Sequence, residues 1–302
     1  MLPNLNRRGF IKAGSAIAAG ACFAGLRGTD ALAADKVQSS SPSAAKVGWL
    51  LGVQQYTFRR FSFYETLDMM VKLGIERVEP AFFLPLDKAR PGLATNEDLS
   101  PELRREVKQR LSDRGLSMPV FYSNLDADAE RAQKIFDFCK EMGAGTIVAE
   151  PPAEAFDMIE KLCHQYKINL AVHNHPKSPE SKYWNPDSVL AVCQGRSPRI
   201  GACCDTGHWV RSGLDPVECL KRMEGRVLGF HLKDVIEAGK PEARDVPLGE
   251  GKANYAEVLN ELHRQGYKGV LTIEYEHDSP ELMTDVAKSV AFVEKWAQSR
   301  RQ

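Results

Sequence analysis

The sequence lacks an excess of charge of either sign, because 40 lysine and arginine residues balance 40 aspartate and glutamate residues. A basic surface for nucleic acid is therefore absent at the level of the whole chain, and we expect no nucleic-acid partner. Past the first thirty-odd residues, no apolar run approaches the roughly 20 residues that span a bilayer. The remaining chain is thus not predicted to be an integral membrane protein. Hydrophobic residues at 43% and charged residues at 26% exclude wholesale disorder.

Three further absences exclude particular kinds of structural or binding site. The 7 cysteines have neither the spacing of a zinc ribbon nor the density of a small disulfide scaffold. Buried thiols are expected, and a disulfide is left open. The turn after the first predicted strand, residues 57–60, holds no glycine, so the dinucleotide-binding turn of a doubly wound fold is missing. The phosphate-binding pattern Gly-x-x-x-x-Gly-Lys is missing too.

The N-terminal segment has the parts of a signal peptide. Arg7-Arg8 with Phe10 resembles a bacterial twin-arginine signal, although asparagine stands where serine or threonine is usual before the arginine pair. An apolar run follows, and Ala31-Leu32-Ala33 offers a cleavage site. We expect residues 1–33 to be removed and the protein to reach the periplasm or another exported location without stable membrane insertion. Residues 34–46, rich in serine, are predicted to form a flexible tether.

A strand-then-helix rhythm runs through the remaining chain. Strands are predicted at residues 51–56, 77–81, 118–122, 146–150, 169–173, 200–205, 227–231 and 270–274. Helices are predicted to begin near residues 63, 100, 128, 153, 186, 215, 255 and 280. Eight such units in about 250 residues are typical of one architecture. The sequence therefore predicts an α/β protein, a single-domain (β/α)₈ TIM barrel over residues 47–302.

Polar side chains gather where five consecutive predicted strands end. They are Glu150, His173, His175, Asp205, His208, His231, Lys233, Glu274 and Glu276. In such a barrel the carboxyl ends of the strands point into one shared mouth. Charges that converge there would repel one another without a cation. Carboxylate and imidazole ligands suit divalent first-row metals, so a metal site is predicted at this mouth.

Four segments in combination resemble the xylose isomerase-like TIM-barrel family, which belongs with the AP endonuclease family 2 superfamily. They are Cys204–His208, Gly229–Asp234, Leu248–Gly251, and Gly266–Gly269 followed by Ile273-Glu274. The family includes sugar isomerases and epimerases, inosose dehydratase and endonuclease IV. The resemblance implies that Asp205, His231 and Glu274 bind the metal.

One departure from the family pattern concerns the fifth strand. Many members place a metal-binding glutamate at its end, where this chain has a histidine, while a glutamate ends the fourth strand instead. We expect the metal to be bound by Glu150, His173, Asp205, His231 and Glu274. His175 and Glu276 are alternatives to His173 and Glu274, because each pair shares a strand face. Mn²⁺ is the preferred metal, with Zn²⁺, Co²⁺, Fe²⁺ and Mg²⁺ as alternatives.

A site of this kind predicts proton transfer beside a metal-bound carbonyl, through a metal-stabilised enediolate. The predicted catalytic residues are Glu150, Glu274, His175, His208 and Lys233. The two glutamates would carry protons, His208 would position the substrate, and Lys233 would stabilise negative charge on oxygen. An apolar wall for a sugar ring, with core packing as the alternative, is predicted from Tyr56, Phe83 and Trp209.

The predicted function is that of a divalent-metal-dependent isomerase or epimerase acting on a neutral sugar or keto-sugar. One alternative is a metal-dependent lyase that eliminates the aglycone from 3-keto-glycosides. Another is a non-catalytic sugar-binding module. The expected partner is a small carbohydrate, and a homo-oligomer is left open.

Overall fold

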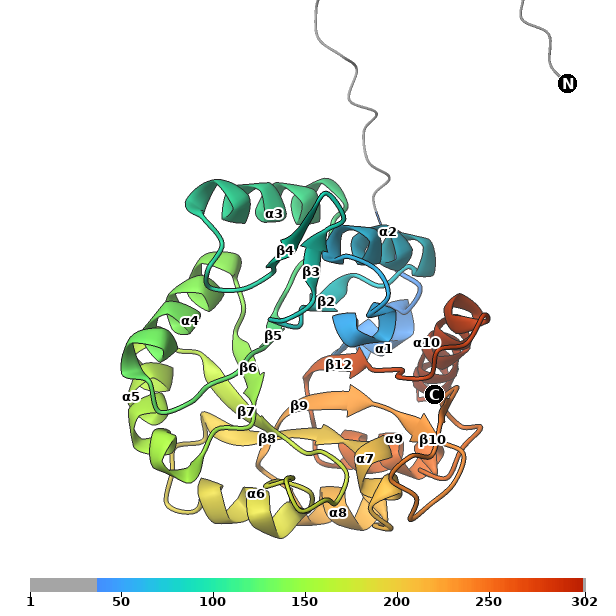
Figure 1. Cartoon of the computed structure of the whole chain (residues 1–302). Coiled ribbons are helices and arrows are strands. Elements are labelled where there is room, and N and C mark those ends of the chain that lie inside the picture. The colour runs from blue at the N-terminus through green and yellow to red at the C-terminus, as the bar shows by residue number, and fades with distance from the viewer. Residues whose placement is uncertain (1–36, 301–302) are drawn as a thin grey trace, which may run out of the picture. The chain divides into compact units, whose positions relative to one another are not determined.

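Eight parallel strands form a closed ring in the computed structural model, which describes residues 37–300 (Figure 1). They are β1 (Trp49–Gln54), β2 (Arg77–Glu79), β5 (Val120–Tyr122), β6 (Thr146–Ala149), β7 (Asn169–His173), β8 (Ile200–Asp205), β9 (Val227–Leu232) and β12 (Gly269–Ile273). The strands pair in the order β2-β1-β12-β9-β8-β7-β6-β5. Parallel bridges from Arg77 to Ser117 and from Ala81 to Tyr122 join β2 to β5. The predicted TIM barrel is confirmed.

A helix follows each strand on the outside of the ring. The eight helices are α2 (Phe63–Leu73), α3 (Pro101–Asp113), α4 (Ala129–Met142), α5 (Phe156–Tyr166), α6 (Pro186–Cys193), α8 (Pro216–Arg222), α9 (Tyr255–Arg264) and α10 (Leu282–Gln298). Local sequence sets their ends. Ser62 and Glu65 form a reciprocal capping box at the start of α2, and Gly74 ends that helix in a left-handed conformation with φ 68°.

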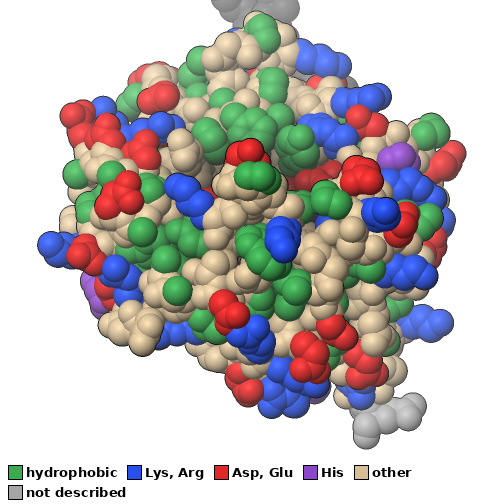
Figure 2. All heavy atoms as spheres, turned by 60° about the horizontal axis from the view of Figure 1, so that its bottom comes forward, with side chains coloured by type: hydrophobic (Ala, Val, Ile, Leu, Met, Phe, Trp, Pro, Cys, Tyr) green, Lys and Arg blue, Asp and Glu red, His purple; other side chains and the backbone are tan. Residues whose placement is uncertain are grey.

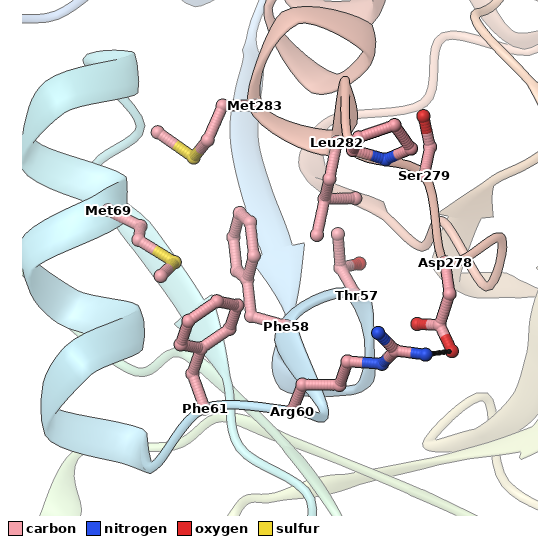
Figure 3. A pocket seen from close by; sticks show the side chains of 10 residues that line it. Thr57, Phe58, Arg60, Phe61, Met69, Asp278, Ser279, Leu282 and Met283 are labelled. Carbon is pink, nitrogen blue, oxygen red and sulfur yellow. Dashed lines mark ion pairs between the residues drawn. The ribbon is translucent and has the colours of Figure 1, made fainter.

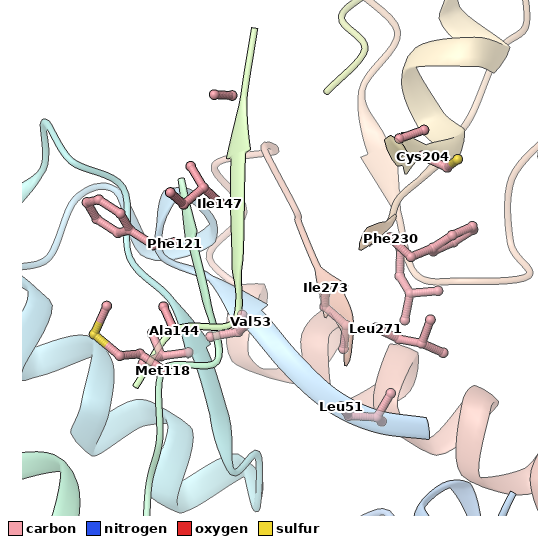
Figure 4. Close-up of a cluster of buried hydrophobic side chains, with 14 of the residues drawn as sticks. Leu51, Val53, Met118, Phe121, Ala144, Ile147, Cys204, Phe230, Leu271 and Ile273 are labelled. Carbon is pink, nitrogen blue, oxygen red and sulfur yellow. The ribbon is translucent and has the colours of Figure 1, made fainter. Parts of the chain in front are cut away.

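The barrel wall has an outer and an inner face with different side chains. Outward-facing residues join helix residues in the main core, and Figure 4 labels several of them, including Leu51, Phe121, Ile147, Cys204, Phe230 and Ile273. A smaller cluster of Val120, Val148, Ala171 and Cys203 lines the inside of the barrel. Because successive strand residues point to opposite faces, the inner face continues at every second residue toward the strand ends.

Several short elements were not predicted. They are the 3₁₀ turns η1 (Gln55–Phe58) and η2 (Ala153–Ala155), helix α7 (Thr206–Arg211), and two hairpins, β3 (Pro85–Asp87) with β4 (Arg90–Ala94) and β10 (Asp234–Val235) with β11 (Asp245–Val246). All lie in connections that follow strands, and α7 begins directly where β8 ends. These insertions shape the rim around the carboxyl ends of the strands.

The predicted tether needs a correction. Residues 42–46 form α1 (Pro42–Lys46) instead of flexible chain, and Ser43 and Ala44 are buried. The carboxylate of Glu294 in α10 accepts the backbone N–H groups of both residues at 2.9 to 3.0 Å. This contact caps α1 from another helix, which a reading of local sequence cannot anticipate. The predicted signal peptide, residues 1–33, lies outside the described residues.

The surface shows the balance of charge that the composition gives. Acidic and basic side chains are interspersed over the face drawn in Figure 2. Within residues 37–300, the helices are all too short or too polar to cross a bilayer.

Candidate functional site

Four neighbouring strands bring buried polar side chains to the mouth of the barrel. His173 is the last residue of β7, Asp205 is the last residue of β8, and Glu274 directly follows β12. His231 in β9 pairs in register with Asp205 on one side and with Thr272 on the other. The structure thus brings together four of the five predicted metal ligands.

The carboxylate of Asp205 is the point on which the histidines converge. Its Oδ2 lies 3.8 Å from Nε2 of His173, 3.7 Å from Nε2 of His208 and 3.8 Å from Nδ1 of His231. These separations are too long for hydrogen bonds. Nε2 of His173 is buried without a hydrogen-bond partner, and Oδ2 of Asp205 is buried with the Lys233 ammonium 3.0 Å away. A buried imidazole nitrogen without a partner, facing a buried carboxylate, is what a cation site requires.

The donor set fits a divalent metal ion. One ligand atom from each of His173, Asp205, His208 and Glu274 falls within 4.8 Å of the others. Imidazole nitrogen together with carboxylate oxygen suits a first-row metal. Although burial disfavours a charged carboxylate, the positive charge around it, including the Lys233 ammonium, holds the pKa of Asp205 well below its usual range. His208 enters this group through α7, whereas the sequence assigned it to the substrate.

Glu150 lies beside this group as the centre of a second cluster. Its Oε1 accepts a hydrogen bond from the Tyr122 hydroxyl at 3.0 Å and is 3.1 Å from Nδ1 of His173. Its Oε2 is 3.0 Å from Nδ1 of His175. Burial works against ionisation, but the two imidazoles lower the pKa of Glu150. Glu150, His173 and His175 also have metal-binding geometry, so His173 belongs to both clusters.

Lys233 occupies the acidic side of the mouth. Its Nζ lies 3.0 Å from Asp205 Oδ2, 3.0 Å from Glu274 Oε2 and 3.2 Å from Glu276 Oε1. It is also 3.1 Å from Nε2 of His208. The side chain is fully buried; burial would lower the pKa of Lys233, yet the surrounding carboxylates raise it well above its usual value. An ammonium ion therefore neutralises this acidic cluster from within.

The segment after β8 fixes Asp205 and makes space for Lys233. Asp205 Oδ1 accepts the backbone N–H of His208 at 2.8 Å and so caps α7. The side chain of Asn174 exchanges two hydrogen bonds with the backbone of Asp205, at 2.8 and 3.0 Å. A Cβ on Gly207 would come within 2.4 Å of the Lys233 side chain. Glycine at this position is thus required for the lysine to reach the carboxylates.

His208 differs from His173 in its preferred protonation state. Burial, reinforced by the charge of Lys233, lowers the pKa of His208 to about 3. Burial also disfavours the charged form of His173, but the neighbouring carboxylates of Asp205 and Glu150 raise its pKa to about 9. A neutral His208 keeps a lone pair available to accept a hydrogen bond or bind a cation.

Sequence reasoning missed several residues that support the cluster. Glu79 in β2 reaches Nε2 of His231 at 2.9 Å. Arg211 in α7 makes ion pairs with Asp245 at 2.6 Å and with Glu276, and its Nη1 is 3.2 Å from Nδ1 of His208. A carboxylate inside a predicted apolar strand is a signal that could have identified Glu79. Asp245 and Arg211 lie in connections whose course the sequence did not predict.

The mouth is open on the side of Glu150. A cavity of about 390 Å³ is lined by Glu150, His175, Ser178, Glu180, Ser181 and Lys182. The His175 side chain is 42% exposed and that of Glu150 is 30% exposed, whereas Glu274 retains 8%. A small polar molecule can therefore approach the cluster past His175. Of the predicted apolar wall, Tyr56 and Phe83 pack together with ring centroids 6.1 Å apart and Phe83 is 49% exposed, whereas Trp209 is buried in the core.

A larger cavity of about 430 Å³ lies between η1, α2 and the segment that leads into α10 (Figure 3). Phe58, Phe61, Met69, Leu282 and Met283 give it apolar walls. The ion pair of Arg60 with Asp278, at 2.8 Å, lies at one end. None of the residues of the two clusters lines it, so it is separate from the mouth.

Comparison with curated sequences finds relatives that match part of this chain. The rhizopine catabolism protein MocC of Rhizobium meliloti is 28% identical over 136 residues, which are 40% of this chain and 41% of that protein. An inosose dehydratase of Mesomycoplasma hyopneumoniae is 28% identical over 141 residues, 42% of this chain and 46% of the enzyme. The matched region spans less than half the length of either relative.

Comparison with solved structures covers most of the chain. An uncharacterized protein from Parabacteroides distasonis is 32% identical, with a TM-score of 0.65 over 82% of this chain and 99% of its own. An L-ribulose 3-epimerase is 15% identical, with a TM-score of 0.63 over 83% of this chain and 95% of its own. At that identity the likeness shows the fold alone.

Two other structures of this fold contain metal ions. The IolI protein with a zinc atom is 17% identical, with a TM-score of 0.59 over 83% of this chain and 97% of its own. A Mycobacterium smegmatis protein in complex with magnesium is also 17% identical, with a TM-score of 0.66 over the same shares. The model of one protein family, described as xylose isomerase-like TIM barrel, matches residues 67–296. The chain therefore belongs to the xylose isomerase-like TIM barrel family.

Proposed function

We propose that the protein is a metal-dependent lyase that eliminates water or an alcohol from the carbon next to the acidic C–H of a keto-sugar or keto-cyclitol. The observation that carries this proposal is the pair formed by Glu150 and His175, which is the accessible acid–base group at the mouth. Elimination can be completed by one proton carrier on one side of the substrate.

The state of the two glutamates argues against the epimerase predicted from the sequence. Epimerisation of this kind needs proton carriers on two faces of the substrate. Glu274 is held in ion pairs with Lys233 and His231, each at 3.0 Å, and these lower its pKa despite its burial. Glu150 is held by three donors. Both carboxylates are therefore stabilised as anions, which makes them poor proton donors.

His175 has the properties that the proton carrier needs. Its Nδ1 contacts a carboxylate that remains ionised, and its Nε2 has no hydrogen-bond partner among residues 37–300. A carboxylate behind an imidazole fixes the orientation and the tautomer of the ring. Nε2 of His175 would take the proton from the carbon beside the carbonyl. The electron pair left behind forms a C=C bond as the C–O bond at the next carbon breaks, and His175 returns its proton to the departing oxygen.

His173, Asp205, His208 and Glu274, with His231 beside them, would hold a divalent cation. Bound there, such a cation supplies Lewis acidity toward a substrate carbonyl. Lys233 adds positive charge at the same place, where oxygen becomes negative during proton removal. Mn²⁺ remains the proposed metal, since the related structures with zinc or magnesium leave the choice open.

Sequence relatives add support for elimination. The inosose dehydratase among them removes water from its substrate by name. The matched segment covers 46% of that enzyme, so its substrate is not transferred to this chain. Release of the protein from the cytoplasm remains part of the proposal, and a neutral substrate suits an exported enzyme better than a sugar phosphate.

The test is NMR in D₂O on a panel of keto-cyclitols, 3-keto-glycosides and free sugars with Mn²⁺ supplied. The expected result is an unsaturated ketone and free water or alcohol. Interconversion of epimers carrying solvent deuterium, without elimination, would instead establish the epimerase. Product formation from free sugars with no solvent deuterium would exclude proton abstraction.

A further inference from the structure

We propose that Glu79 is a positioning residue for His231, acting by accepting the hydrogen of its Nε2 so that Nδ1 is the nitrogen presented to the mouth. Oε1 of Glu79 lies 2.9 Å from Nε2 of His231. On the other side of the ring, Nδ1 is 3.0 Å from Glu274 Oε2 and 3.8 Å from Asp205 Oδ2. The side chains of Glu79 and His231 are each only 1% exposed.

The contact crosses the inside of the barrel. Glu79 comes from β2 and His231 from β9, which are separated in the ring by β1 and β12. The two residues are 152 positions apart in the sequence. Their pairing is therefore a property of the closed barrel.

A carboxylate behind a metal-binding histidine has a known effect. It fixes which ring nitrogen carries hydrogen, orients the ring and makes the other nitrogen a better ligand. The neighbouring histidine shows the same arrangement, because Glu150 is 3.1 Å from Nδ1 of His173 while Nε2 of that ring faces Asp205. Two imidazoles are thus held from behind by carboxylates and aimed at one oxygen of Asp205.

The second carboxylate oxygen of Glu79, Oε2, lies in a different environment from Oε1. Oε2 is buried without a hydrogen-bond partner. Glu79 lines a cavity of about 420 Å³ whose other walls include Thr146, Asn169 and Gly269 at the amino ends of strands. A cavity of this size admits water, which can hydrate a buried carboxylate. Glu79 therefore contacts His231 at the mouth and also borders a cavity near the amino ends of the strands.

The role of Glu79 in catalysis rests on the proposed metal site. Two measurements test the positioning of His231 and the metal site separately. The variants are Glu79→Gln, which keeps an acceptor, and Glu79→Met, which removes it. Glu294→Gln is the matched control, because Glu294 is also a buried carboxylate but caps α1 away from the mouth. The first readout is the Nε2–H resonance of His231 in metal-free protein labelled with ¹⁵N-histidine. The second is Zn²⁺ affinity, measured by competition with a chelator.

We expect a slowly exchanging Nε2–H resonance for His231 in the wild type and in Glu294→Gln, and its loss in Glu79→Met. Zn²⁺ affinity should fall about 10- to 100-fold in Glu79→Met and less in Glu79→Gln. An unchanged resonance, or an unchanged affinity in a folded Glu79→Met protein, would overturn the proposal. If the wild type binds no metal, the proposed function fails and the resonance alone decides the role of Glu79. If Glu79→Met does not fold, Glu79→Gln decides by its Zn²⁺ affinity: a fall relative to the wild type supports the proposal, and an affinity equal to that of the wild type overturns it.

Discussion

Nδ1 of His175 lies 3.0 Å from Oε2 of Glu150, and this contact places an imidazole backed by an ionised carboxylate at the open edge of the barrel mouth. The other imidazoles of the cluster are buried. The proposed proton carrier and the proposed cation site are therefore adjacent. His173 connects them, since it contacts Glu150 through Nδ1 and faces Asp205 through Nε2.

Replacing His175 by alanine should lower turnover by about 10²- to 10⁴-fold, the usual contribution of a general acid or base. Metal content should remain near that of the wild type, because His173, Asp205, His208 and Glu274 are untouched. Steady-state kinetics with elemental analysis measures both quantities. His164→Ala, on the exposed side of α5, is the matched control and should leave both unchanged. Full activity in His175→Ala would remove His175 from the mechanism.

Metal should stabilise the folded protein through Asp205. A cation at 100 times its dissociation constant adds about 2.7 kcal/mol to the free energy of unfolding. Chelation should therefore lower the melting temperature of the wild type, measured by calorimetry, and Asp205→Asn should bind little metal. Retention of stoichiometric metal by Asp205→Asn would show that the ion is held elsewhere.

Lys233→Met should destabilise the metal-free protein. The ammonium lies within 3.2 Å of oxygens of Asp205, Glu274 and Glu276, and its removal leaves two buried carboxylates and the half-buried Glu276 without that counterion. Breaking buried ion pairs from one side costs about 3–5 kcal/mol. Added metal should raise the melting temperature of this variant more than that of the wild type, because the cation replaces the lost charge. Equal shifts in the two proteins would contradict this account.

Glu294→Gln should lower stability at neutral pH but not in acid. Burial would raise the pKa of Glu294, but hydrogen bonds from Ser43 and Ala44 lower it below its usual value. A carboxyl with a lowered pKa contributes stability above its unfolded pKa, and this contribution is lost as the pH falls through the folded pKa. Hydrogen bonds to a charged group contribute about 1.5–3 kcal/mol. Urea unfolding across the acid range should show the two proteins converging at low pH, and a constant difference would refute the linkage.

Export should depend on the arginine pair at Arg7 and Arg8. Lysine at both positions keeps the positive charge but removes the twin-arginine pattern. We expect the precursor of the double variant to accumulate in the cytoplasm, as judged by fractionation and immunoblotting. The single variant Arg27→Lys, outside the pattern, serves as the control. Normal processing and export of the double variant would exclude this route.

The order of strands and helices could be predicted from the sequence alone because it depends on local periodicity and on residues at helix ends. Apolar runs of strand length alternate with amphipathic stretches, and the predicted helix starts lie close to those of α2, α6 and α9. The period of two along each strand also places His173, Asp205, His231 and Glu274 on inner positions. Those residues could be proposed as one group once a closed barrel was predicted.

The tertiary structure decided which atoms meet inside that group. Glu150 turns both oxygens toward Tyr122, His173 and His175, and Lys233 enters the acidic cluster only because Gly207 lacks a side chain. Contacts across a barrel depend on strand order, register and the space left by neighbouring side chains, and none of these is encoded within one segment. For the same reason, Glu79 and His231 become partners only when the ring closes.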